Sequence, residues 1–196
     1  MPKMTVVAAR TAGGPVIGVE LVTSAMLRGL ACPYCGLAVP ADEADAVSAQ
    51  AAWGWCAARA VAEGRTVGLL LLTPDGSGSR SPARIVTAFV APELVGAGTG
   101  RELVRTAAAG LVRARVGSVR ATSSAVRSCS SLPAGFLLAT GFTPSERAGR
   151  WRLDLGATAR VPFEGVMDRL ERLVQSVRPV APPEPAGRQV IGAWRS

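Results

Sequence analysis

Apolar residues along this chain follow two patterns, and each pattern predicts a different element. Short β-branched or leucine-rich runs bounded by glycine, proline and polar residues are typical of strands. They occur at residues 16–22, 66–72, 83–91 and 119–123, with a hairpin formed by 142–147 and 150–155. Alanine-rich or periodic stretches predict helices. These lie at residues 24–30, 42–53 and 133–140, and after a glycine cluster at 96–100.

The stretch after the glycine cluster has the clearest helical pattern. Two adjacent rows of apolar side chains form one stripe: Leu103, Ala107, Leu111 and Val104, Ala108, Val112. Arg101, Arg105 and Arg113 fall outside this stripe. We therefore expect an amphipathic helix whose apolar side packs on the sheet.

Residues 57–62 and the C-terminal region leave alternatives open. Alanine at 57–62 favours a continued helix, whereas the following Glu-Gly-Arg favours a turn between two strands. A separate apolar stripe at about 162–177 predicts a helix, followed by a proline-rich tail. We place a domain boundary between 1–156 and 157–196. The C-terminal helix could cover the domain, close a substrate site or form a homodimer.

Composition excludes several kinds of chemistry. The 196 residues contain no histidine, which rules out Ser-His-Asp and Cys-His hydrolases and histidine-liganded zinc enzymes. An apolar content of 48% is enough for one domain with a buried core. Neither a signal-peptide pattern nor a membrane-spanning run is visible, so we expect a soluble, cytoplasmic protein with no membrane partner.

The net charge of +8 is unevenly distributed. Between Arg101 and Arg152, nine arginines stand against two glutamates. Such a field favours a polyanion, either nucleic acid or a phosphorylated cofactor. Aromatic residues are only 5% of the chain and do not alternate with arginine, which argues against nucleic acid.

Four scattered cysteines, Cys32, Cys35, Cys56 and Cys129, are too few for a disulfide scaffold, and we expect them to be reduced. The Cys32-Pro-Tyr-Cys35 segment has the spacing of a thiol-redox motif, but the helix that would activate it is not predicted. It also has the spacing of a zinc knuckle that could recruit Cys56. The third interpretation is a plain turn with no metal.

The most informative segment runs from Val90 to Val104, where a strand enters a glycine-rich turn that opens directly into the amphipathic helix. Glycines let consecutive N–H groups converge on one point, and the helix N-terminus adds partial positive charge. This pattern predicts a cradle for a pyrophosphate. A P-loop would need Lys-Ser/Thr where Arg101-Glu102 stands, and a dinucleotide fingerprint would need glycine at Arg101.

This segment resembles motif A of the GNAT superfamily of acetyl-CoA-dependent N-acyltransferases, a strand ending in Val-x-Pro followed by Arg/Gln-x-x-Gly-x-Gly/Ala and a helix. Here the match is Val90-Ala-Pro92, then Val95-Gly-Ala-Gly-Thr-Gly100. Two further segments fit the same family in order and spacing, Glu63 to Gly68 and Phe136 to Phe142. A Cys-x-x-Cys near the start and the Trp53-Gly-Trp-Cys56 segment resemble an actinobacterial GNAT subfamily.

The resemblance implies a mixed, mostly antiparallel sheet flanked by helices, an α/β fold of the α+β kind, with a C-terminal helical extension. It makes residues 57–62 a strand. It also implies an acetyl-CoA co-substrate and direct attack by the amine of an acceptor. The residues implied in cofactor binding are Phe89, Val90, Val95, Gly96, Ala97, Gly98, Thr99, Gly100, Arg101 and Ser131.

The chain also departs from the family pattern. Val95 replaces the usual Arg or Gln of the loop, and Arg101 is a candidate to replace its phosphate contact. Leu137 occupies the position of the tyrosine that often acts as general acid. Glu20, Glu93 and a relay through water are left as candidate bases. A GNAT protein that binds acyl-CoA without catalysis is therefore the main alternative function.

Overall fold

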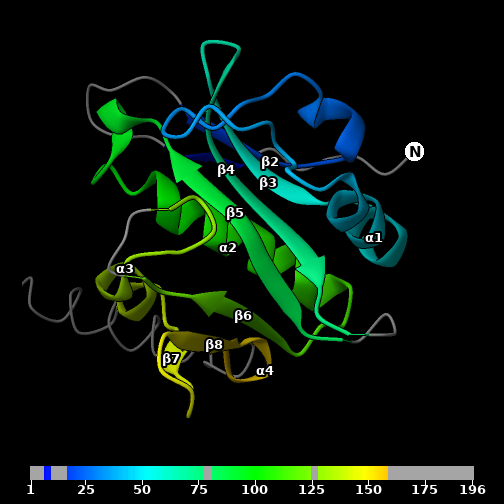
Figure 1. Cartoon of the computed structure of the whole chain (residues 1–196), viewed down its shortest axis with the longest axis vertical. Coiled ribbons are helices and arrows are strands. Elements are labelled where there is room, and N and C mark those ends of the chain that lie inside the picture. Colours follow the sequence, from blue (N-terminus) through cyan, green and yellow to red (C-terminus); the bar gives the residue numbers. More distant parts are fainter. Residues whose placement is uncertain (1–6, 10–16, 77–80, 125–127, 159–196) are drawn as a thin grey trace, which may run out of the picture. The chain divides into compact units, whose positions relative to one another are not determined.

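The computed structural model describes residues 7–9, 17–76, 81–124 and 128–158. Within these ranges eight strands form one sheet in the order β1-β2-β3-β4-β5-β6-β8-β7 (Figure 1). The strands are β1 Val7–Ala9, β2 Ile17–Val22, β3 Ala57–Ala62, β4 Arg65–Pro74, β5 Ala83–Val90, β6 Ser118–Thr122, β7 Thr143–Pro144 and β8 Arg150–Asp154. The helices are η1 Ser24–Leu27, α1 Glu43–Trp53, η2 Pro92–Leu94, α2 Thr99–Arg113, α3 Ala134–Ala139 and α4 Leu155–Thr158.

Neighbouring strands are antiparallel except for β5 and β6, which run parallel because α2 crosses over between them. These two strands pair only where they begin, at Ala83 with Val119 and Arg84 with Arg120. Beyond these pairs they separate, so the C-terminal half of β5 has one edge without a neighbouring strand. The sheet therefore opens between β5 and β6, as Figure 1 shows.

Helices α1 and α2 cover opposite faces of the sheet (Figure 1). Leu103, Ala107 and Leu111 of α2 are buried in one apolar cluster, and Ala46 and Ala49 of α1 in the other. A fully buried leucine stabilises the fold by about 1.5–3 kcal/mol, so these two clusters hold the layers together. Val112, expected on the apolar stripe of α2, is 42% exposed because it lies at the margin of the contact.

Within the described residues, the predicted strands and the helices at 42–53, after the glycine cluster and at 133–140 are confirmed, including the strand at 57–62. Pairing with β2 on one side and β4 on the other fixes Ala57–Ala62 as a strand despite the helical preference of alanine. Three details differ. The weakly patterned start contains strand β1, which pairs with β2. The helix expected at 24–30 is a short 3₁₀ helix. Leu155 begins α4 instead of ending a strand.

No helix in the part of the chain described here is long and apolar enough to cross a bilayer. The predicted helix at about 162–177 and the proline-rich tail lie outside the described residues. The domain boundary at residue 156 stays a prediction.

Candidate functional site

The open edge of β5 presents two residues, Ala88 and Val90. Ala91 donates its N–H to Val67 of β4 over 2.7 Å, so the alternate residues Ala88 and Val90 direct their main-chain groups away from β4. The main chain of Phe89 pairs with Leu69 of β4, and its side chain is buried on the α1 face. Of the two strand residues predicted to bind a cofactor, only Val90 therefore reaches the open edge.

Two distant segments of the chain contact this edge. The Ala88 N–H donates to the carbonyl of Cys129 over 2.7 Å. The Tyr34 hydroxyl donates to the carbonyl of Val90 over 2.6 Å. An added ligand strand at this edge would exchange these two hydrogen bonds for its own.

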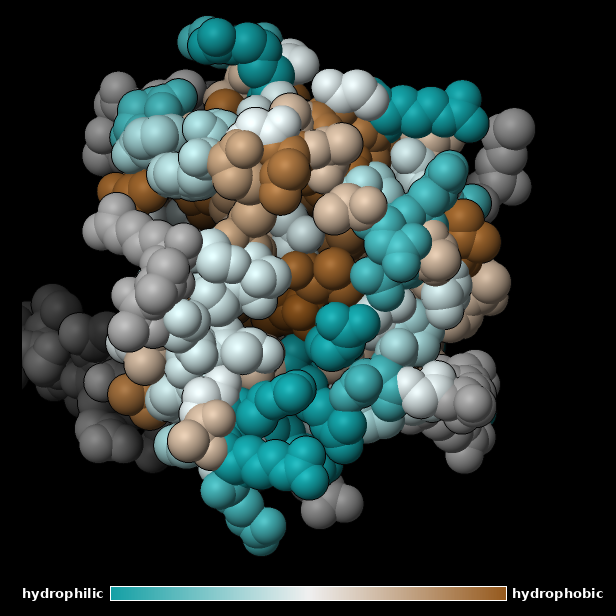
Figure 2. Space-filling model, in the orientation of Figure 1, coloured by the Kyte–Doolittle hydropathy of each residue, from teal (hydrophilic) through white to brown (hydrophobic). Residues whose placement is uncertain are grey.

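A cavity of about 410 Å³ lies where β5 and β6 separate. It is lined by Arg84, Ile85, Val86, Thr122, Ser124, Ser128, Ser130, Ser131 and Arg150. Ser131, predicted as a cofactor ligand, is therefore placed in the opening of the sheet. Figure 2 shows hydrophilic residues gathered over β6 and β8 on this face, where Arg120, Arg150 and Arg152 are exposed. The cavity combines hydroxyl groups with cationic side chains, which suits a polar or anionic ligand.

The glycine-rich loop forms the predicted cradle at the N-terminus of α2. Gly96 and Gly98 have φ angles of 87° and 86°, a conformation that residues with a Cβ atom rarely adopt. Gly100 lets Phe136 approach, since a Cβ there would lie 3.0 Å from its ring. Because α2 begins at Thr99, the N–H groups of Thr99, Gly100 and Arg101 have no acceptor within the helix. The Ala97 N–H instead donates to Leu94, so this amide is occupied.

The side chain of Thr99 gives this cradle a second feature. Thr99 is only 4% exposed, and its hydroxyl oxygen has no hydrogen-bond partner among the described residues. A buried hydroxyl without a partner costs about 1–3 kcal/mol of stability. Because this hydroxyl is enclosed by the chain, the groups that an anion can reach are the three main-chain amides without an acceptor in the helix.

Val95 and Arg101 lie on either side of this cradle. Val95 is 68% exposed and brings no polar group to the loop. The Arg101 guanidinium is exposed in the first turn of α2 and donates to the Ala139 carbonyl at the end of α3, 3.4 Å away. This single long contact leaves most of its donors free for an anion.

The two predicted base candidates, Glu20 and Glu93, lie in different surroundings. Glu20 lies opposite Arg59 on β3 and forms an ion pair with it. Glu93 is exposed in η2, directly before the glycine loop. Neither carboxylate belongs to the cavity lining.

Sequence reasoning missed Tyr34. Leu137, at the position of the usual tyrosine, is completely buried in α3 and offers no proton. The chain contains one tyrosine, and the structure brings it from residue 34 to the end of β5. A single tyrosine in a turn was the available signal, but only the fold places its hydroxyl at the open edge.

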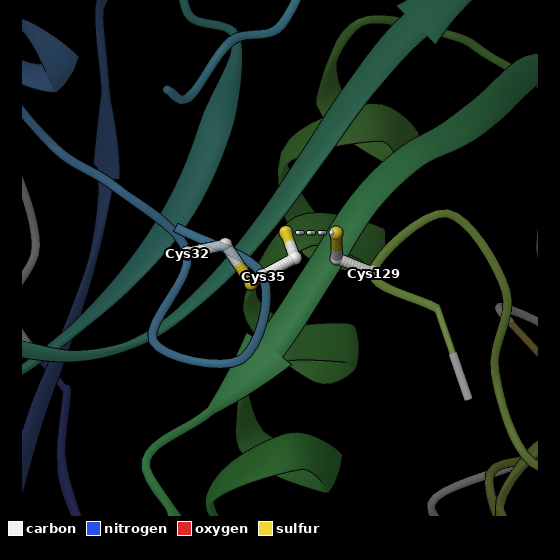
Figure 3. A group of neighbouring side chains, drawn as sticks. All are labelled: Cys32, Cys35 and Cys129. Carbon is white, nitrogen blue, oxygen red and sulfur yellow. Dashed lines mark hydrogen bonds between the residues drawn. The ribbon is translucent and has the colours of Figure 1, made fainter. Parts of the chain in front are cut away.

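The cysteines are arranged differently from the prediction. The third thiol beside Cys32 and Cys35 belongs to Cys129, not Cys56, as Figure 3 shows. Cys56 is buried in the sheet and its thiol contacts the Val22 carbonyl. Burial raises the pKa of Cys56 to about 11 and that of Cys129 to about 12. The Leu37 N–H, helped by the Cys129 thiol, lowers the pKa of Cys35.

Comparison with known proteins supports the fold. No protein-family model matches the sequence, and no curated protein matches it. YncA from Salmonella typhimurium, solved with its cofactor acetyl-CoA, aligns with a TM-score of 0.51 at 16% identity over 71% of this chain and 94% of its own. A mutant of the toxin AtaT bound to the C-terminus of the antitoxin AtaR aligns with a TM-score of 0.51 at 13% identity, over 74% and 99%.

A third solved structure, the GNAT family N-acetyltransferase YhbS from Escherichia coli in complex with CoA, aligns with a TM-score of 0.48 at 14% identity, over 75% and 86%. The chain thus has the GNAT fold, a mixed sheet flanked by helices and opened between two parallel strands.

Proposed function

We propose that this protein is an N-acyltransferase that transfers an acetyl group from acetyl-CoA to the primary amine of an acceptor. The observation that carries this proposal is the group of main-chain amides at the start of α2 that have no acceptor in the helix, presented by a loop in which Gly96 and Gly98 have positive φ. An anion held there would lie one loop away from the open edge of β5. YncA, which shares the architecture, was solved with acetyl-CoA, and this supports the same co-substrate here.

The residues present fit such a co-substrate. The main-chain amides from Thr99 to Arg101 and the Arg101 guanidinium would hold the pyrophosphate. The open edge at Ala88 and Val90 would pair with the amide-containing arm. Acetyl-CoA, when bound, supplies the acetyl group as a thioester. An N–H donor at this edge would stabilise negative charge developing on the thioester oxygen.

Three side chains are proposed to carry out proton transfer. Tyr34 is placed to protonate the leaving thiolate, because its hydroxyl already lies at the open edge. Glu93 and Glu20 are the carboxylates proposed to accept the proton of the attacking amine. The ion pair with Arg59 holds Glu20 away from this role, so Glu93 is the stronger candidate of the two.

A second candidate function is acyl-CoA binding without catalysis. It is favoured by Leu137, which fills the position of the usual acid with a completely buried aliphatic side chain. The two functions share the cradle and differ in the chemistry at the β5 edge.

Two measurements on the full chain separate these functions. Calorimetry with CoA tests the cradle, and acetylation of an amine panel followed by mass spectrometry tests transfer. We expect binding and turnover, and binding without turnover would favour the second candidate. Gly98→Ala should weaken CoA binding because it strains the loop at a φ of 86°, whereas Gly117→Ala, in open space, should not. Failure of wild-type protein to bind CoA would overturn both.

A further inference from the structure

Three cysteine side chains meet on the α1 face of the sheet, outside the cradle. The sulfur atoms of Cys32, Cys35 and Cys129 all lie within 4.8 Å of one another, and those of Cys35 and Cys129 are 3.3 Å apart. Figure 3 shows the thiols of the 32–35 turn pointing toward Cys129 beside β5. Cys35 and Cys129 are 94 positions apart in the sequence, so folding alone brings this group together.

Main-chain hydrogen bonds hold the turn that carries Cys32 and Cys35, and both thiols lie on the same side of it. The Gly36 N–H donates to the Cys32 carbonyl over 2.9 Å, and the Cys32 N–H donates to the Leu37 carbonyl over 2.9 Å. Gly36 has a φ of 69°, and Ala31 and Ala38 form an antiparallel bridge at the base.

The third thiol is positioned independently of this turn. The Cys129 carbonyl accepts the Ala88 N–H of β5, and a bridge between Ser128 and Ser131 closes its short segment. Two separately anchored segments thus present thiols to one point. Around a tetrahedral zinc ion with Zn–S bonds of about 2.3 Å, sulfur atoms lie about 3.8 Å apart. The sulfur atoms of Cys35 and Cys129 are slightly closer than this, at 3.3 Å, and no pair of the three sulfur atoms is more than 4.8 Å apart.

We propose that Cys32, Cys35 and Cys129 form a zinc-binding site, with a water molecule as the fourth ligand. Binding replaces three S–H bonds with three Zn–S bonds and releases three protons, with no change of oxidation state. Three protein ligands and one exchangeable water are sufficient for tetrahedral zinc. Zinc binding does not depend on the proposed transferase function, but the site borders it: zinc would tie the 32–35 turn, which carries Tyr34, to the Cys129 segment at the open edge of β5.

The test uses the reduced, metal-free full chain titrated with Zn²⁺ against a competing chelator. We expect one zinc ion per chain and an affinity that falls at least about 100-fold in Cys129→Ser and in Cys35→Ser. Cys35 is exposed, so its serine variant should fold normally even if Cys129→Ser does not. The matched control is Cys56→Ala, which leaves all three proposed ligands in place and should bind zinc as tightly as the wild type.

Cobalt(II) gives a spectroscopic signal that depends on thiolates bound to the metal. A cysteine with a purely structural role would not contribute to it. Wild-type protein loaded with Co²⁺ should show thiolate charge-transfer bands and the visible bands of a tetrahedral site, and Cys35→Ser should lose them. Absence of stoichiometric zinc, or equal loss of affinity in Cys56→Ala, would overturn the proposal. So would isolation of the protein with a Cys35–Cys129 disulfide that resists mild reductant and binds no metal.

Discussion

The Tyr34 hydroxyl donates a hydrogen bond to the main-chain carbonyl of Val90 across 2.6 Å. This bond joins a turn near the start of the chain to the strand edge where the proposed thioester would lie. If Tyr34 protonates the leaving thiolate, Tyr34→Phe should lower kcat about 100-fold, the lower range for a general acid. The affinity for CoA, measured by calorimetry, should change by less than about threefold.

Leu37→Ala is the matched control for Tyr34→Phe. Leu37 is an exposed residue of the same turn, and its structural hydrogen bonds are made by the main chain. This variant should keep full kcat. A Tyr34→Phe enzyme with unchanged kcat would show that the phenol only caps Val90.

The buried hydroxyl of Thr99 should affect stability and leave CoA binding unchanged. Thr99→Val removes an unsatisfied polar atom, so the free energy of unfolding of the free protein should rise by about 1 kcal/mol. Because the enclosed hydroxyl cannot reach the pyrophosphate, the affinity for CoA should change by less than about twofold. Urea unfolding and calorimetry measure the two effects. Thr106→Val, in the middle of α2, should leave CoA affinity unaltered, and a destabilised Thr99→Val would contradict the prediction.

Arg101 should contribute charge to the cradle. Arg101→Ala should weaken CoA binding about three- to tenfold, as expected for an exposed charge contact, and more strongly at low salt. Arg113→Ala removes the same charge from the last turn of α2, about 18 Å away at 1.5 Å per residue. Since that distance exceeds the Debye length in ordinary buffer, Arg113→Ala should bind CoA normally. Equal losses in both variants would indicate a general field effect.

Gly110 sets how closely α2 approaches the sheet. A Cβ at this position would lie 2.8 Å from side-chain atoms of Leu21 and Trp55. Gly110→Ala should therefore lower the free energy of unfolding by about 1–2 kcal/mol, because overpacking outweighs the gain in helix propensity. Gly135→Ala in α3 meets nothing within 4 Å and should raise it instead. The two variants are compared with the wild type by their midpoints of urea unfolding. If both midpoints shift in the same direction, this account is refuted.

The sequence predicts most of the architecture because runs and periodicity are local properties. The helix Thr99–Arg113 follows from its apolar stripe, and the glycine loop before it follows from residues that tolerate positive φ. Ala57–Ala62 could not be assigned from propensity, since its strand depends on partners on both sides. The family resemblance supplied this tertiary information, and the structure confirms it.

The site was less predictable because its parts come from distant segments. The glycine loop and Arg101 are contiguous, and the sequence places them together. Tyr34 lies 56 positions from Val90, and Cys35 lies 94 from Cys129. Neither separation leaves a local signal, so the sequence favoured Cys56 as the third thiol. The unsatisfied state of Thr99 likewise depends on burial by the folded chain.

Strands β5 and β6 are joined by only two residue pairs, so the sheet has fewer main-chain hydrogen bonds here than between its other long strands. Five strands lie on one side of this seam and three on the other. At its end, Asp75 binds Arg120 over 2.6 Å and approaches Arg84 to 3.9 Å. One apolar cluster under α2 contains residues from both sides of this seam, so the core holds the two halves together where the strands do not. The width of the opening is therefore set by side-chain packing and by the Asp75 ion pairs more than by strand pairing.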